Sequence, residues 1–174
     1  MKKRNVVKLA ALGMMAATLM TGINVQAEGE KVVTAMTSID LTPELCDPVK
    51  SGPDFRLYEM IYDPLVRYGE NGEIEPALAE SWKISEDGTT YTFHLRKDVK
   101  FSDGTVFNAD NVIWNYNRWV EQEVTGNFSA KLESVTKVDD YTVEFKFAES
   151  CYTLLIEFSY PRPFRFTCES ALDE

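Results

Sequence analysis

One arginine of this chain combines a chemically specific side chain with a stiff backbone. Arg162 stands between Pro161 and Pro163, and each proline ring fixes its own φ angle. A guanidinium held in this way is well suited to grip a carboxylate through two parallel hydrogen bonds. A surface arginine or a member of a structural ion pair is the alternative interpretation. Arg162 is therefore the first candidate for a ligand-binding residue.

The residues needed for nucleophilic or metal chemistry are sparse. His94 is the single histidine, and its alternation with Phe93 and Leu95 places it on the polar, solvated face of a strand. A catalytic triad needs a histidine beside Ser or Cys, and neither a Gly-x-Ser-x-Gly elbow nor a glycine-rich phosphate loop is found. One histidine and scattered cysteines do not form a local metal site. We therefore predict no catalytic residue and no metal ligand.

Neighbouring carboxylates occur at three places, Glu86-Asp87, Asp139-Asp140 and Glu73 with Glu75. Each pair falls at a predicted turn, where Asp is favoured because its side chain bonds the local backbone. A glycosidase-like enzyme would need carboxylates brought together from distant positions. A secreted hydrolase stays open as an alternative, and solvated turn residues are the simpler interpretation.

Residues 1–27 have the pattern of a secretory signal peptide. A basic start at residues 2–8 precedes an apolar run, and Val25-Gln26-Ala27 is typical of a cleavage site. The run has about 15 residues, which is short for a membrane span of about 20. We expect cleavage near Ala27 and a mature chain of residues 28–174 in the periplasm.

The mature chain would be strongly acidic. All 28 acidic residues but only 14 of the 18 basic residues follow residue 27, which gives a net charge of −14. This charge argues against nucleic acid as a partner. The length suffices for one domain with a core. Cys46, Cys151 and Cys168 allow at most one internal disulfide, with Cys151 to Cys168 as one of three options, or all three cysteines are reduced and buried.

Alternating apolar residues predict two antiparallel β-hairpins. The first places Trp82 and Ile84 before a turn at Asp87-Gly88, with a second apolar face on residues 91–95. The second hairpin joins residues 132–138 to residues 141–147. Each hairpin would bury one face and leave the other polar.

Helices are predicted next to these hairpins. Asn108 is a candidate N-cap for an amphipathic helix, and residues 152–158 form a short apolar helix. Another helix begins near Pro53 and ends at Asp63-Pro64, and its apolar face would carry Phe55, Tyr58, Ile61, Tyr62 and Leu65. Short strands are expected at residues 31–37 and 65–68. The fold class is α/β, with a mixed, largely antiparallel sheet and flanking helices.

Six short motifs follow one another along the chain: Tyr62-Asp-Pro-Leu-Val66, Leu78-Ala-Glu-Ser-Trp82, Ser85-Glu-Asp-Gly-Thr89, Thr92-Phe-His-Leu-Arg96, Val99-Lys-Phe-Ser-Asp-Gly104 and Asn108-Ala-Asp110. In this order they resemble the family 5 extracellular solute-binding proteins of ABC importers. The resemblance implies part of the first lobe of a two-lobed, class II-like periplasmic binding protein. We expect these residues to match only the N-terminal third of such a receptor. The receptor would deliver a peptide or a nickel chelate to a permease in the inner membrane.

The motif Pro161-Arg-Pro-Phe-Arg-Phe166 is similar to the nickel-binding branch of that family, where the first arginine contacts carboxylates of the chelator. The resemblance assigns this role to Arg162 and places Phe128, Phe55 and Lys50 at further cleft positions. Lys50 stands where that branch has Tyr, Phe55 where it has Met, and Phe128 near its Trp. These replacements leave peptide and nickel chelate both open.

The resemblance implies a monomeric binding protein without enzymatic activity or resident cofactor, in which nickel would be cargo. A stand-alone structural or interaction domain is the remaining alternative.

Overall fold

The computed structural model describes residues 47–50, 55–128 and 130–172. The expected signal peptide, the strand expected at residues 31–37 and Cys46 lie outside these described residues. Every described residue belongs to one compact unit, Thr37–Glu174. Within the described part, none of the helices has the length and apolar character that crossing a membrane requires.

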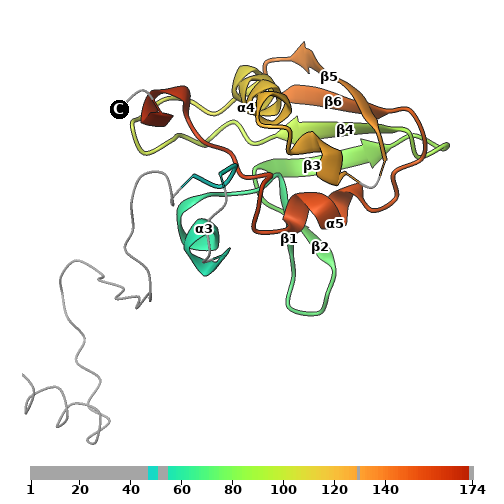
Figure 1. Cartoon of the computed structure of the whole chain (residues 1–174), viewed down its shortest axis with the longest axis horizontal. Coiled ribbons are helices and arrows are strands. Elements are labelled where there is room, and N and C mark those ends of the chain that lie inside the picture. The colour runs from blue at the N-terminus through green and yellow to red at the C-terminus, as the bar shows by residue number, and fades with distance from the viewer. Residues whose placement is uncertain (1–46, 51–54, 129, 173–174) are drawn as a thin grey trace, which may run out of the picture. The chain divides into compact units, whose positions relative to one another are not determined.

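A four-stranded sheet with the strand order β3-β4-β6-β5 forms the centre of the fold (Figure 1). It is built from β3 (Ala79–Ile84), β4 (Thr90–Leu95), β6 (Thr142–Phe147) and β5 (Leu132–Asp139). All of its strand pairs are antiparallel. The two predicted hairpins are confirmed, and the pairing of β4 with β6 joins them into one sheet.

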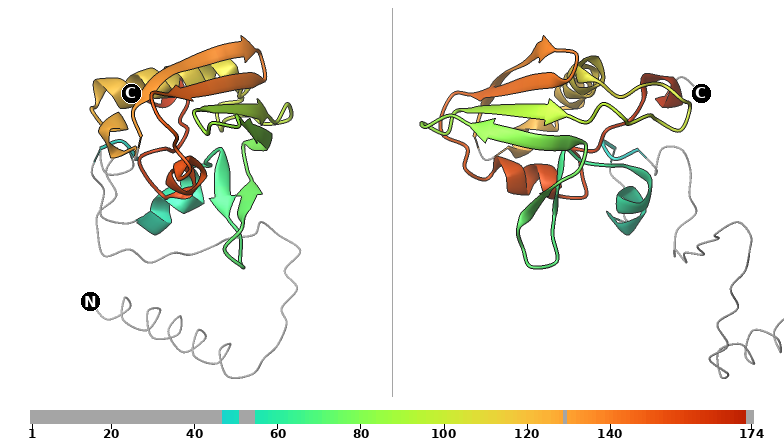
Figure 2. Two further views of the ribbon diagram at one scale, coloured as in Figure 1. Left: turned by 90° about the vertical axis from the view of Figure 1, so that its right-hand side faces the viewer. Right: turned by 180° about the vertical axis from the view of Figure 1, so that it is seen from behind.

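A second, two-stranded sheet projects away from the first (Figures 1 and 2). It pairs β1 (Val66–Tyr68) with β2 (Ile74–Pro76) in antiparallel register. The connecting turn begins at Gly69, whose N–H donates to the carbonyl of Glu73 at 2.8 Å. The strand predicted at residues 65–68 is therefore confirmed.

The long helix α4 (Ala109–Glu121) begins where the sequence predicts. Asn108 accepts hydrogen bonds from the N–H groups of Asp110 and Asn111, and the side chain of Asn111 accepts from the N–H of Asn108. This reciprocal capping satisfies donors that the first helical turn leaves open. The helix packs against β5 and β6 and buries Val112 and Trp119.

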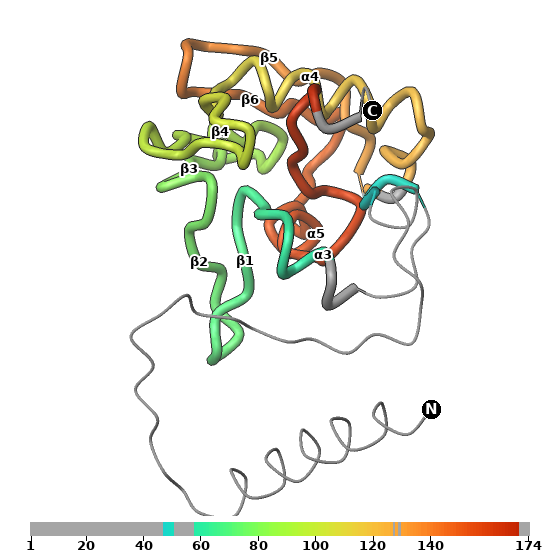
Figure 3. Tube along the Cα trace, turned by 90° about the vertical axis from the view of Figure 1, so that its left-hand side faces the viewer, coloured from blue at the N-terminus to red at the C-terminus, as the bar shows by residue number. Residues whose placement is uncertain are grey.

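Two shorter helices lie on the side of the fold that carries β1 (Figure 3). α3 (Phe55–Ile61) stops before Asp63-Pro64, as predicted, and α5 (Leu154–Ser159) occupies most of the expected range. α5 packs against β1 and β2. Two single-turn 3₁₀ helices, η1 (Thr125–Asn127) and η2 (Glu169–Leu172), complete the described elements.

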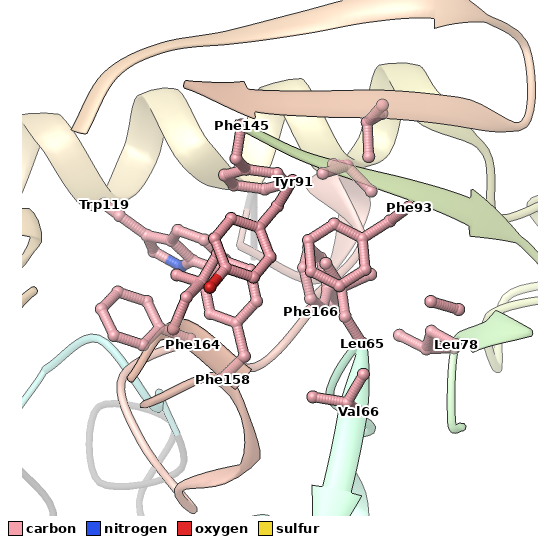
Figure 4. Packing of buried hydrophobic residues seen from close by; sticks show 14 of the residues in the cluster. Leu65, Val66, Leu78, Tyr91, Phe93, Trp119, Phe145, Phe158, Phe164 and Phe166 are labelled. Atoms are coloured by element: carbon pink, nitrogen blue, oxygen red, sulfur yellow. The ribbon is translucent and has the colours of Figure 1, made fainter. Parts of the chain in front are cut away.

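Phe158 on α5 lies at the centre of an aromatic cluster beneath the sheet (Figure 4). Its ring centroid lies 5.1 to 6.4 Å from those of five other rings, at tilted or edge-on angles that aromatic pairs prefer. These five rings belong to Phe93, Trp119, Phe128, Phe145 and Phe164. The cluster ties both hairpins, α4 and the segment after α5 into one core.

The apolar pattern overstates burial at several positions, and Ile84 and Ile61 are two of them. Ile84 is 44% exposed because β3 is an edge strand and Ile84 is its last residue, next to the turn. Ile61 is 52% exposed at the end of the seven-residue helix α3. Both residues fit the expected periodicity, but in the described part of the chain they are left largely uncovered.

Candidate ligand-binding site

Arg162 lies in the extended segment that follows α5, and it is half-buried. Its Nε donates a hydrogen bond to the carbonyl oxygen of Pro48 at 3.3 Å. Within the described residues, the two terminal nitrogens of the guanidinium have no hydrogen-bond partner. The contact therefore orients Arg162 while leaving its paired terminal nitrogens open to another group.

The segment under Arg162 is held by a buried ion pair. The Asp47 carboxylate contacts the guanidinium of Arg118 on α4 and accepts a hydrogen bond from the N–H of Val49 at 3.1 Å. Both charged side chains are mostly shielded from solvent. A buried charge pair of this kind depends on both members, because either charge alone would be left desolvated. Asp47 and Arg118 thus fix the position of Pro48, on which Arg162 rests.

Lys50 lies at the end of the same short segment. Its side chain is exposed, and its Nζ is 4.0 Å from Oδ2 of Asp47. Arg162 is bonded to Pro48, two residues before Lys50, so these two predicted site residues are connected through the same short segment. A role for Lys50 in contacting a ligand stays a prediction.

Phe128 belongs to the aromatic cluster. Its ring stacks on Phe164, with centroids 4.4 Å apart and planes inclined by 16°. Phe164 is two residues from Arg162, so this stack places Phe128 beside the same extended segment. Phe128 is 8% exposed and lines a cavity of about 370 Å³ together with Tyr116 and Lys131. Its function as a ligand contact stays a prediction, whereas its packing function is evident.

Phe55 is the first residue of α3, and its side chain lies outside the described residues. The four predicted site residues therefore divide by location. Arg162 is hydrogen-bonded to Pro48, and Lys50 lies two residues further along that short segment. Phe128 is linked to the segment of Arg162 through Phe164, and Phe55 can be placed by its backbone alone.

The carboxylates considered above as candidate catalytic groups bond the backbone of the turns in which they lie. Asp87 accepts from the N–H of Thr89 at 3.1 Å, and Asp139 accepts from the N–H of Tyr141 at 2.7 Å. These are the backbone-bonding turns that the sequence predicts. The pKa of each carboxyl lies below its ordinary value, for Asp87 chiefly because the Ser85 hydroxyl donates to it and for Asp139 chiefly because of the Tyr141 N–H.

His94 points away from the core on β4 and is half-buried rather than fully solvated, because its Nδ1 lies 3.4 Å from the hydroxyl of Thr142 on the paired strand. Cys151 and Cys168 are both buried, and no disulfide joins the two. In the described part of the chain, no three His, Cys, Asp or Glu side chains gather in a way that could hold a metal ion.

Three charged residues of this region are absent from the sequence-based prediction: Asp47 and Arg165, which are buried, and Arg118, which is half-buried. Arg118 stands on α4 in a polar position of the helical pattern, 71 residues from the aspartate that it contacts. Arg165, the second arginine of the Pro-Arg-Pro-Phe-Arg-Phe motif, is buried where Arg162 is not. No local periodicity distinguishes these residues from ordinary surface charges. Only the alternation with buried Phe164 and Phe166 marks the segment as packed.

Comparisons with known proteins identify the family of this chain. The family model described as bacterial extracellular solute-binding proteins, family 5 middle, matches residues 73–169, which is more than half of the chain. The nickel-binding periplasmic protein of Escherichia coli is 38% identical over 120 residues, a stretch that covers 64% of this chain and 22% of that protein.

Two solved structures extend the similarity to the fold. NikA from Brucella suis in complex with Fe(III)-EDTA superposes with a TM-score of 0.65 and 38% identity, covering 74% of this chain and 27% of that one. DppA from Helicobacter pylori in complex with the peptide STSA superposes with a TM-score of 0.61 and 29% identity, covering 74% of this chain and 29% of that one. The matched stretch thus covers about a quarter of the length of these relatives. The chain belongs to family 5 of the bacterial extracellular solute-binding proteins.

Proposed function

We propose that this chain contributes one wall of the ligand site in the substrate-binding subunit of an ABC importer. Arg162 would receive a carboxylate of the ligand. The observation that carries the proposal is the orientation of Arg162, whose Nε is held by Pro48 while its terminal nitrogens stay open within the described structure. Two parallel N–H groups of a guanidinium match the two oxygens of a carboxylate.

The ligands named for two solved relatives share this chemistry. EDTA and the peptide STSA both carry carboxylate groups, although they are otherwise unlike. A guanidinium that recognises the carboxylate, and not the remainder of the ligand, would serve either class. We therefore propose a carboxylate-bearing ligand, which is either a peptide or a metal chelate.

A metal would be cargo in this scheme. A chelate brings its own metal ligands, so binding it requires protein groups that contact the chelator and leave the ion coordinated as it arrived. The proposal accordingly assigns no metal ligand to this chain.

The same proposal places the protein in the periplasm after removal of the leader near Ala27, as a monomer that passes its ligand to a membrane permease. It includes no enzymatic activity. Support comes from the leader pattern and from the periplasmic nickel-binding relative.

Isothermal titration calorimetry of the purified chain with Fe(III)-EDTA, nickel-histidine and the tetrapeptide Ser-Thr-Ser-Ala tests the proposal. At least one of them should bind, and Arg162→Gln should weaken that binding by about tenfold or more, because charge-assisted hydrogen bonds contribute roughly 1.5–3 kcal/mol. The matched control is Arg96→Gln, an exposed arginine directly after β4, which should leave the affinity unchanged. Equal affinity of the Arg162→Gln variant and the unaltered chain would remove Arg162 from the site.

A further inference from the structure

The tip of the β1–β2 hairpin carries two adjacent residues that can react with each other. Asn71-Gly72 is the only Asn-Gly pair in the sequence, and both residues are exposed. Gly72 adopts a φ of +87°, and no described atom lies within 4 Å of the position that a Cβ would occupy there. Because glycine has no side chain, its main-chain nitrogen is open to approach by a neighbouring group. The amide of Asn71 can therefore meet the nitrogen of Gly72 without a clash.

The bonds that hold this turn are local. The N–H of Gly72 donates to the carbonyl of Gly69 at 3.1 Å, and the N–H of Gly69 donates to the carbonyl of Glu73 at 2.8 Å. The side-chain amide of Asn71 reaches Oε1 of Glu73 at 3.5 Å, near the limit for a hydrogen bond. β1 and β2 have three residues each and project from the larger sheet (Figures 1 and 2). A two-stranded hairpin of this size is marginally stable, so we expect local opening to release the N–H of Gly72.

We propose that Asn71 is a self-modification site, at which Gly72 converts the thermolabile asparagine to aspartate or isoaspartate. The nitrogen of Gly72 loses its proton to solvent and attacks Cγ of Asn71. A new C–N bond forms, the bond from Cγ to Nδ2 breaks, and Nδ2 takes a solvent proton and leaves as ammonia. The product is a succinimide ring, which water opens at either of its two carbonyls. The overall reaction consumes one water and releases one ammonia, with no oxidation or reduction.

Two Asp-Gly turns of the same chain provide a contrast. Asp87-Gly88 and Asp103-Gly104 also place their glycines at positive φ, +69° and +90°. Each of these carboxylates accepts three hydrogen bonds from N–H and hydroxyl groups, at 2.5–3.1 Å. Such bonds stabilise the ionised form, and an ionised carboxylate resists attack by a nucleophile. Of the three turns, the one at Asn71 therefore combines a following glycine with a neutral, reactive amide.

The reaction would change both the charge and the length of the turn. The N–H of Asn71 donates to Oε2 of Glu73 at 3.1 Å, so the new carboxylate would stand close to an existing one. Glu70 and Glu75 line the same surface pocket of about 460 Å³, and like charges repel one another. Isoaspartate also adds a carbon to the main chain and disturbs the hydrogen bonds to Gly69. We expect the modified hairpin to be less ordered, independently of the proposed ligand site.

Trypsin isolates the reaction in one peptide. Cleavage after Arg67 and Lys83 gives residues 68–83, in which Asn71 is the only asparagine or glutamine. Incubation of the folded chain should raise the mass of this peptide by the difference between NH₂ and OH. The rise should be faster at mildly alkaline than at neutral pH, because the nitrogen of Gly72 must lose its proton, and chromatography should resolve aspartate and isoaspartate products. The peptide of residues 101–118 has four asparagines but no Asn-Gly pair, and as the control it should keep its mass.

Two variants test the reacting groups, and circular dichroism verifies that both are folded. Gly72→Ala places a Cβ beside the nitrogen and should slow the mass change about tenfold. Asn71→Gln keeps an amide but requires a larger ring, and it should abolish the change.

Three results would overturn the modification site. In the first, the peptide of residues 68–83 changes in urea but not in the folded chain, which would show that the turn protects Asn71. In the second, Gly72→Ala reacts as fast as the unaltered chain. In the third, aspartate forms without isoaspartate, which would show that water attacks the amide directly and that Gly72 takes no part.

Discussion

The side-chain amide of Asn115 pairs with the main chain of Thr167 in the manner of a neighbouring β-strand. Nδ2 of Asn115 donates to the carbonyl of Thr167 at 2.9 Å, and the N–H of Thr167 donates to Oδ1 at 3.1 Å. Asn115 is fully buried on α4 and also bonds the carbonyl of Asn111. One amide therefore fastens the segment after Phe166 to the long helix.

Replacing Asn115 by Ala should lower the free energy of unfolding by about 2–4 kcal/mol, because the N–H and C=O of Thr167 would be buried without partners. Urea denaturation measures this loss. Asn117→Ala, an exposed change on the same helix, should cost less than about 0.5 kcal/mol. If the two variants were equally stable, the pairing with Thr167 would contribute nothing to stability.

Phe158→Ala should be among the most damaging core substitutions, because it removes the ring that contacts five others. The expected loss is about 3–5 kcal/mol, from lost burial and the cavity left behind. Thermal and urea unfolding provide the measurement. Ile156→Ala on the same helix, where the side chain is exposed, should cost less than about 1 kcal/mol. A loss similar to that of Ile156→Ala would show that the cluster repacks around the gap.

The ion pair of Asp47 with Arg118 should behave as one unit in a double-mutant cycle. Asp47→Asn keeps an acceptor for the N–H of Val49 but leaves the Arg118 guanidinium without its opposite charge. It should lower the free energy of unfolding by about 3–5 kcal/mol. Adding Arg118→Met should recover part of this loss, with a coupling energy of about 1–3 kcal/mol. Lys50→Met is the control for the exposed 4.0 Å contact, and its effect should stay below about 1 kcal/mol. Strict additivity in the cycle would contradict a buried pair.

Three aspartates in turns should make the free energy of unfolding decrease as the pH becomes acidic. Hydrogen bonds lower the pKa of Asp87, Asp103 and Asp139, led by the Ser85 hydroxyl, the Ser170 hydroxyl and the Tyr141 N–H respectively. Because the folded pKa lies below the unfolded one, the ionised form stabilises the fold. This contribution is fully present above the unfolded pKa of about 4 and is lost as pH falls through the lower folded values.

Unfolding free energies measured from about pH 5 to about pH 2 should fall less steeply in the triple Asp→Asn variant than in the unaltered chain. At neutral pH the triple variant should be the less stable of the two, because a neutral amide is the weaker acceptor. Glu86→Gln is the matched control beside Asp87, and it should leave the slope unchanged. Equal slopes for the triple variant and the unaltered chain would contradict the prediction. They would show that the three aspartates stabilise the fold equally well in their protonated and ionised forms.

The local parts of the fold are predictable from the sequence. Alternation in residues 91–95 and 141–147 marks the buried faces of β4 and β6, and Asp87-Gly88 marks the turn between β3 and β4 because Gly88 adopts a φ of +69°. Asn108 marks the start of α4. These features depend on residues within a few positions of one another, so a single sequence carries them.

The long-range parts are not predictable in this way. No period indicates that β4 pairs with β6, that Asn115 meets Thr167 or that Arg118 meets Asp47. At the candidate site, the sequence alone indicates Arg162, through its two flanking prolines, and the motif around it. The burial of Arg165 is not, because a charged residue in an extended segment carries no local sign of what packs on it.

The strand order has a consequence for how this chain reaches its native state. β3 with β4 and β5 with β6 are adjacent in sequence and require only short loop closures. Pairing β4 with β6 brings together residues about 50 positions apart, such as Phe93 and Val143. Closing that loop costs entropy before the aromatic cluster can form. Because α4 lies within the loop, early helix formation would shorten the search, and we infer that the docking of the two hairpins limits the folding rate.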